Sequence, residues 1–343
     1  MYIENKRVKK YISFWLLAMF SLIAIMIIVG GLTRLTDSGL SITTWELFAG
    51  FIPPLSHLDW INYFDLYKKI PEYKLQNYSM TIDEFKIIFW WEWLHRFLGR
   101  LVGISFLIPL IYFTFKLKFK LVKNFYVIFL LICFQGFIGW YMVSSGLVDR
   151  VDVSHYRLSI HLLIAFIILT LILWNYLKIN IKQSNTDKIK YNLPLLFLFF
   201  LFIQITIGAF VSGMDAGKIY NSWPLMGNTY FPDDNVPMNL LKISVFNDAS
   251  LNQFIHRNLA YFIIIIYLLI VIQVYRNKQY EFFGIIKIIG IFLAIQIFLG
   301  IITILSGAHI ITASLHQISS IFLVSASIFL LFLNSNINSQ PLN

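Results

Sequence analysis

The sequence predicts an all-α integral membrane protein with eight transmembrane helices. Composition is the first reason: hydrophobic residues make up 58% of the 343 residues and charged residues only 13%, which excludes an ordinary soluble domain. The second is that eight stretches reach the roughly 20 apolar residues that a span requires. These stretches are residues 11–33, 89–114, 124–146, 158–177, 192–213, 255–275, 284–305 and 312–333.

The distribution of charge is the third reason, and it also predicts the orientation. Lys and Arg gather before the first stretch and in every second connection after it, whereas the intervening connections hold most of the Asp and Glu. By the positive-inside rule, the basic connections and both termini are expected in the cytoplasm. The net charge of +10 therefore reflects topology and not nucleic-acid binding. We expect a multi-pass protein of the cell inner membrane, in contact with lipid.

An internal repeat divides the chain into two halves. The matching positions are residues 29–39 with 207–217, Trp45 with Trp223, His95 with His256, residues 135–146 with 296–307, and His161 with His316. We predict two parallel four-helix bundles, an N-terminal half over residues 1–180 and a C-terminal half over residues 181–343. The first half contains a long outer loop, 37–88. We expect its amphipathic stretch 58–70 to be partly helical, lying on the membrane surface and capping the first bundle.

Four histidines lie near the start of the second, fourth, sixth and eighth apolar stretches: His95, His161, His256 and His316. An ionisable residue inside a membrane helix is costly and is a functional-site hypothesis by default. In each half the two histidines come from helices that run in the same direction, so they can face one another at equal depth. Each can then offer one axial nitrogen to an iron, and the pattern predicts two bis-histidine haem centres.

The residue four positions after each histidine is small, and it lies on the same helix face. These residues are Gly99, Ala165, Ala260 and Ser320. A flat macrocycle next to the histidine requires such a neighbour, although small residues also suit helix–helix packing. A single intramembrane histidine is more often structural, and a catalytic zinc site usually takes three protein ligands, so zinc is the weaker candidate. His57, His155 and His309 have no repeat partner and are expected to be structural or solvated.

The halves differ at one informative position, where Glu92 of the first half stands in place of Gln253. Glu92 lies one turn before His95, where a carboxylate can take up a proton, orient a water or stabilise positive charge. The alternative is a Glu favoured by the helix dipole. The asymmetry predicts chemistry in the first half and a permanent haem in the second. Arg96 and Arg257 follow their histidines directly and are candidates for binding haem propionates or for anchoring helices at the headgroups.

Several motifs together carry a family resemblance that covers nearly the whole chain. They are Glu92-Trp93-x-His95-Arg96, the stretch 135–146, the outer turn 37–41 and His316-Gln317. The chain resembles the heme A synthase family, in its mitochondrial and alphaproteobacterial branch, which lacks the outer-loop cysteine pair. The resemblance implies a membrane oxidoreductase that acts on a methyl group of haem O. Two hydroxylations of the C8 methyl and loss of water leave the formyl group of haem A, for use in cytochrome oxidase.

The resemblance also implies residue roles and partners. His256 and His316 would bind the iron of a resident haem b, His95 and His161 would face the iron of the substrate haem O, and Glu92 would be catalytic. Because haem O is hydrophobic, direct transfer from haem O synthase (protohaem farnesyltransferase) is favoured, and we expect the two proteins to dock. The sequence does not identify the electron acceptor. Two alternatives remain: a di-haem b-type membrane cytochrome that transfers electrons from quinol and, less favoured, a transporter built from parallel repeats.

Overall fold

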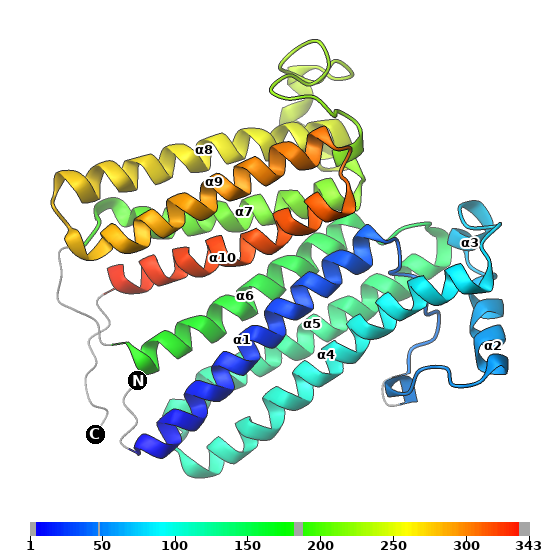
Figure 1. Cartoon of the computed structure of the whole chain (residues 1–343), viewed down its shortest axis with the longest axis horizontal. Helices are drawn as coiled ribbons and strands as arrows, with labels where there is room; N and C mark the ends of the chain where they lie inside the picture. Colours follow the sequence, from blue (N-terminus) through cyan, green and yellow to red (C-terminus); the bar gives the residue numbers. More distant parts are fainter. Residues whose placement is uncertain (1–4, 47–48, 182–187, 336–343) are drawn as a thin grey trace. The chain divides into compact units, whose positions relative to one another are not determined.

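A computed structural model describes residues 5–46, 49–181 and 188–335. Within these ranges the chain is helical apart from turns and one isolated bridge between Met226 and Thr229. Eight of the described helices are long and apolar enough to cross a membrane, which confirms the predicted all-α membrane class. They are α1 (Lys6–Leu35), α4 (Ile82–Lys116), α5 (Phe119–Asp149), α6 (His155–Asn180), α7 (Leu193–Gly213), α8 (Ala249–Arg276), α9 (Phe283–Leu305) and α10 (Ile310–Asn334) (Figure 1).

Side-chain caps fix the starts of the two helices that carry His95 and His256. At the start of α4, Thr81 and Glu84 form a capping box, in which each side chain accepts a hydrogen bond from the other residue's backbone N–H. At the start of α8, the carboxylate of Asp248 accepts from the backbone N–H of Leu251 at 3.0 Å. These caps fix the residues at which the two helices begin.

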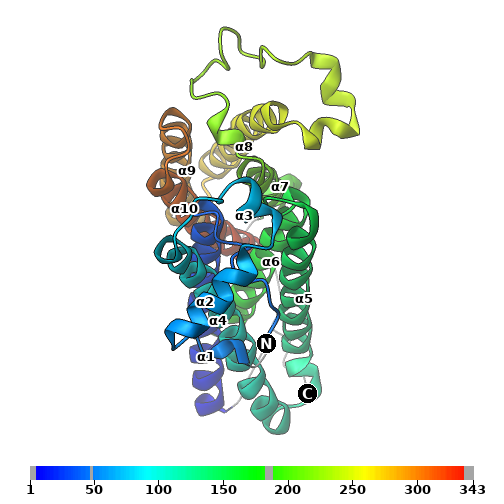
Figure 2. The ribbon, with the colours of Figure 1, turned by 90° about the vertical axis from the view of Figure 1, so that its right-hand side faces the viewer.

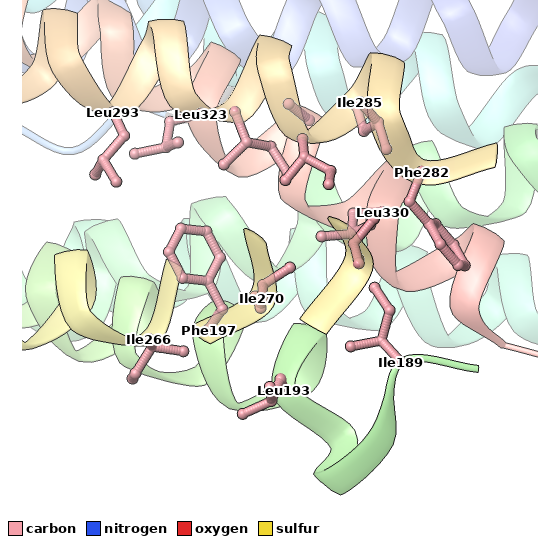
Figure 3. Close-up of a cluster of buried hydrophobic side chains, with 14 of the residues drawn as sticks. Ile189, Leu193, Phe197, Ile266, Ile270, Phe282, Ile285, Leu293, Leu323 and Leu330 are labelled. Atoms are coloured by element: carbon pink, nitrogen blue, oxygen red, sulfur yellow. The ribbon is translucent and has the colours of Figure 1, made fainter. Parts of the chain in front are cut away.

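The chain divides into two compact units. The first unit is Leu22–Ala165, and the second unit is Met1–Ser21 together with Phe166–Asn343. In the second unit α7 packs against α8 and α10, and α9 packs against the same two helices, which closes a four-helix ring (Figure 1). Buried apolar side chains fill this ring. Figure 3 shows part of the layer, including Phe197, Ile270, Leu293 and Leu330 from the four helices.

In the first unit, α4 and α5 pack together, and the end of α1 joins them through a hydrogen bond from the Thr33 hydroxyl to the carbonyl of Trp91. The outer loop contains α2 (His57–Tyr67) and α3 (Pro71–Leu75), which confirms the helical stretch expected there. α2 packs on α4 through aromatic side chains: the rings of Phe64 and Tyr67 lie 5.1 and 5.2 Å from that of Phe85. This part of the loop is therefore a packed element with a core of its own.

The corresponding connection of the second unit, residues 214–248, has a different form (Figure 2). It contains no α-helix, and its described structure consists of turns with the 3₁₀ segments η3 (Ala216–Lys218), η4 (Pro237–Leu241) and η5 (Ile243–Asn247). Its beginning and its end pack against α8. The two outer connections therefore differ in length and structure, although each meets the helix that carries the first histidine of its unit.

Candidate metal centres

The structure brings the four predicted histidines together as two pairs. His95 on α4 and His161 on α6 face one another in the first unit, with ring centroids 6.4 Å apart and ring planes at 65°. His256 on α8 and His316 on α10 do the same in the second unit, at 6.4 Å and 77°. The two pairs thus have the same separation, although they belong to different units.

This separation fits two imidazoles that share one iron. A metal–nitrogen bond of about 2 Å on each side, plus about 1 Å from nitrogen to ring centre, places two axial imidazole centroids about 6 Å apart. The Nδ1 atoms of all four histidines are buried without a hydrogen-bond partner among the described residues. The residues present therefore fit a porphyrin, which supplies its own four nitrogens.

Each imidazole packs against a glycine of a neighbouring helix. The pairs are His95 with Gly30 of α1, His161 with Gly139 of α5, His256 with Gly208 of α7, and His316 with Gly300 of α9. A Cβ at these glycines would lie 2.8, 3.0, 3.0 and 3.1 Å from the imidazole Cε1, inside the normal carbon–carbon contact of about 3.5 Å. Only glycine therefore leaves each ring where it is. The sequence shows these glycines at matching positions of the repeat, but it did not reveal that they contact the histidines.

Glu92 is 2% exposed, and its carboxylate accepts four hydrogen bonds. Oε1 accepts from Nε and a terminal nitrogen of Arg96, at 3.0 and 2.6 Å. Oε2 accepts from the Ser41 hydroxyl and from the backbone N–H of Ile42, both at 2.8 Å. The carboxylate that was expected beside the first haem therefore also fastens the outer turn after α1 to α4.

Arg96 and Arg257 hold the outer turns by the same contacts in both units. Their guanidinium groups donate to backbone carbonyls at 2.7–2.9 Å, from Arg96 to Ile42 and Thr44 and from Arg257 to Tyr220 and Ser222. These acceptors stand at matching positions when the turns are aligned on Trp45 and Trp223. Both arginines therefore clamp the turn that precedes their helix. Their predicted role toward haem propionates stays a prediction.

The second unit has no counterpart of the Glu92 ion pair. Gln253, 1% exposed, donates to the carbonyl of Tyr220 at 3.1 Å, and its Oε1 has no partner among the described residues. Nε of Arg257 is likewise buried without a partner in that part of the chain. The clamp is thus present in both units, but the charge pair is present only in the first.

A further difference lies one turn before the second histidine of each pair. Arg157 donates to the Ser145 hydroxyl and to the Tyr141 hydroxyl, and it lies over the Tyr141 ring at 4.5 Å. At the matching position of the second unit is Thr312, whose hydroxyl is 3.0 Å from that of Ser306. The first pair therefore has a cation nearby that the second pair lacks.

The other three histidines lie at helix starts, away from the two pairs. His57 is the exposed first residue of α2, and His155, the first residue of α6, contacts the Tyr156 ring at 4.4 Å. His309 is the exposed residue that caps α10, with Nδ1 accepting from the backbone N–H of Ile311 at 3.4 Å. Their positions agree with the structural or solvated character expected from the sequence.

The fold and the two histidine pairs define a class of protein: polytopic membrane proteins with paired intramembrane imidazoles, the arrangement by which helical bundles hold haem. The family model of the COX15-CtaA cytochrome oxidase assembly proteins matches residues 13–328. The chain belongs to this family, which confirms the resemblance seen in its motifs.

The similar proteins of comparable length are named heme A synthase. The heme A synthase of Pelagibacter ubique is 50% identical, over 98% of this chain and 100% of the relative. The heme A synthase of Rickettsia bellii is 42% identical, over 94% of this chain and 97% of the relative. That of Flavobacterium johnsoniae is 39% identical, over 95% and 98%. This chain therefore matches its relatives from end to end and not through one shared domain.

Proposed function

We propose that this chain is a heme A synthase, a membrane oxidoreductase that converts haem O into haem A for cytochrome oxidase. Membership of the family and near full-length similarity to relatives of that name support the proposal. The main observation behind the proposal is that the two histidine pairs have the same ring separation but different neighbouring side chains. Both pairs are spaced to share an iron, but only the first has a buried carboxylate one turn away on the same helix.

In this proposal the second pair, His256 and His316, holds a resident haem b, which supplies one-electron redox chemistry when it is bound. The chain's own contribution there is orientation. Gly208 and Gly300 let the two rings pack closely on α7 and α9, and Arg257 holds the outer turn over that end of the unit.

The first pair, His95 and His161, receives the substrate haem O. The proposed reaction oxidises the C8 methyl group: two successive hydroxylations each replace a C–H bond by C–OH, with the oxygen taken from water or O₂. Each is a two-electron oxidation of the carbon that needs an external oxidant, and the diol then loses water to leave a formyl group. Glu92 is placed to accept a proton on this side, because it is an acceptor-only carboxylate on the helix of His95. Arg96 and Ser41 hold it in position.

The topology is part of the proposal. The same clamp and the same glycine–imidazole contacts recur at matching positions, which supports two parallel halves, 1–180 and 181–343. The basic connections support cytoplasmic termini, and each histidine pair would then lie toward the opposite face of the membrane. Docking with haem O synthase would deliver the hydrophobic substrate within the bilayer. The proposal does not identify the electron acceptor.

Replacing Glu92 by Gln, the residue of the second half, tests the assignment. The variant is expressed in a host that makes haem O but not haem A, and the extracted haems are separated by chromatography. Glu92→Gln should keep the haem b spectrum while haem O or a partly oxidised product accumulates. Because Glu92 also holds the outer turn, Ser41→Ala is the matched control: it removes one bond of the same set and should still yield haem A. Normal haem A from Glu92→Gln would remove Glu92 from the mechanism.

The equal 6.4 Å separation of the two pairs favours one second candidate, a di-haem b-type cytochrome that transfers electrons from quinol. Pyridine haemochrome analysis of the purified protein separates the two functions. A synthase should carry one b-type haem per chain with sub-stoichiometric haem O or A. An electron-transfer cytochrome should carry two permanent b-type haems.

A further inference from the structure

The outer connection of the second unit, residues 214–248, exposes a short apolar segment. Within residues 236–243, four apolar side chains are 57–89% exposed: Val236, Met238, Leu241 and Ile243. Figure 1 and Figure 2 show that the connection projects sideways from the start of α8, on the side away from α10. A group of exposed apolar side chains in one segment is typical of a surface that contacts lipid or another protein.

Hydrogen bonds to the start of α8 hold this segment on both sides. Before it, the Asn235 side chain donates to the Asp248 carboxylate at 3.0 Å and to the Ser250 hydroxyl at 2.9 Å. After it, the backbone carbonyl of Val245 accepts from the side chain of Asn252 at 2.8 Å. The exposed apolar side chains therefore project from a backbone that is fastened to α8 at both ends.

Aromatic residues of the same connection contact α8 at the depth of its histidine. The Tyr230 hydroxyl donates to the side chain of Asn258 at 2.6 Å, and Nε1 of Trp223 donates to the Tyr261 hydroxyl at 3.1 Å. The two α8 residues are about 3 and 8 Å farther along the helix axis than His256. Because helical side chains lean toward the N-terminus of their helix, these contacts lie near the level of His256 itself.

The face of α8 that these contacts cover is turned away from the four-helix ring. Both α8 residues share a face with Phe254, whose ring lies 5.0 Å from that of Phe231. His256 is about 200° around the helix from Phe254, and it faces inward to His316. The apolar stretch of this helix is residues 255–275. The connection therefore runs along the outward face of a membrane span, at the depth where headgroups meet acyl chains.

We propose that residues 236–243 insert into the boundary between lipid headgroups and acyl chains, so that the second outer connection is a membrane-binding loop. The exposed apolar side chains contact acyl chains there, while Trp223 and Tyr230 lie in the aromatic belt typical of that depth. Lys242 stands between two of the apolar residues, and its long side chain can carry the ammonium group to the headgroups. The inference goes beyond the proposed function and does not depend on it.

Depth favours lipid over a protein partner as the occupant. A connection that extended into water would place its contacts before the first turn of α8, but the contacts of Trp223 and Tyr230 lie beside the span. The segment is not a regular helix or strand, and the boundary tolerates such a backbone because water still reaches its polar groups there. Lipid is therefore the surrounding medium on this face of α8.

The test places a polarity-sensitive fluorophore on single cysteines of the full chain in lipid nanodiscs. Cys133→Ser first removes the one cysteine of the sequence. Leu241→Cys and Ile243→Cys then carry the label in the apolar segment. Asn277→Cys is the matched control, because Asn277 is exposed in the polar turn at the other end of α8. Quenching is measured with nitroxides attached to the lipid acyl chains and with aqueous iodide.

At positions 241 and 243 we expect blue-shifted emission and iodide quenching several-fold weaker than at position 277. A nitroxide near the headgroup end of the acyl chain should quench these labels more than one at the chain end, because insertion is shallow. Changing Met238, Leu241 and Ile243 together to Ser, with the label on Val236→Cys, should abolish quenching by lipid. Iodide quenching at 241 and 243 equal to that at 277, without quenching by lipid, would overturn the inference and assign the segment to a protein partner.

Discussion

The glycine behind His316 allows a direct test of whether the imidazole position depends on the packing seen here. Gly300→Ala would put a Cβ 3.1 Å from Cε1 of the ring, closer than normal contact by about half an ångström. The ring must move by roughly that amount, or the helices must separate. With axial bonds of about 2 Å, such a shift is large for an iron that both His256 and His316 must reach.

The magnitude follows from the cost of overpacking. An extra methyl in a well-packed interior costs about 1–3 kcal/mol. If that strain falls on the haem complex, haem b affinity drops by roughly 5- to 150-fold, since each 1.4 kcal/mol is about tenfold. The same change improves helix propensity by about 1 kcal/mol, so the substitution should not unfold α9 by itself. Loss of haem with retained helicity therefore reports the position of the ring.

The assay is haem b per chain, by pyridine haemochrome, on protein that elutes as a single species. Gly139→Ala probes the first pair in the same way, because its Cβ would lie 3.0 Å from Cε1 of His161. That variant should retain haem b but form less haem A. Gly136→Ala is the matched control one turn earlier on α5, where a Cβ would meet nothing within 4 Å, and it should behave as the unmodified protein. Full haem b content in Gly300→Ala, with unchanged release, would refute the geometric argument.

Two further predictions concern the first unit. Arg157→Thr introduces the residue of the second half and removes the cation near His161. If Arg157 binds a propionate, the KM for haem O should rise about tenfold or more while haem b content stays constant. An unchanged KM would assign Arg157 to the Ser145 and Tyr141 contacts alone. Burial raises the pKa of the Glu72 carboxyl to about 8, well above its ordinary value. The folded loop therefore keeps a proton that the unfolded chain releases, and its stability should fall as pH rises from about 4.5 through about 8, by a few kcal/mol in all. Limited proteolysis of the loop at pH 5 and pH 9 measures this fall, and Glu72→Gln should remove it; equal cleavage at both pH values in the unmodified protein would contradict the argument.

Much of the fold was predictable because it depends on patterns that are local in sequence. Apolar length gave the eight spans, and the repeat in register gave the two histidine pairs, since helices of equal direction place equivalent residues at equal depth. The helix in the outer loop was also predictable, because the amphipathic stretch that became α2 is continuous in the sequence.

What the sequence did not reveal depends on contacts between segments distant along the chain. The propionate role of Arg96 stays a prediction, but the sequence did not show that the outer turn brings the carbonyls of Ile42 and Thr44 to this arginine. The place of Glu92 beside a haem also stays a prediction, and the sequence did not show that four donors from that turn and from α4 converge on its carboxylate. A pattern of residue types shows that a carboxylate sits near a histidine. It does not show which backbone N–H will reach that carboxylate.

The comparison of the two units separates the residues that build a site from those that decide what the site does. Glycine behind each imidazole and arginine clamped to the outer turn occur in both units, so neither can account for a difference in chemistry. Differences near the rings include a carboxylate against an amide at Glu92 and Gln253, and a guanidinium against a hydroxyl at Arg157 and Thr312. A buried carboxylate and a cation beside only the first pair favour chemistry at that pair, so exchanging these side chains between the units should change the reaction while the frame is preserved.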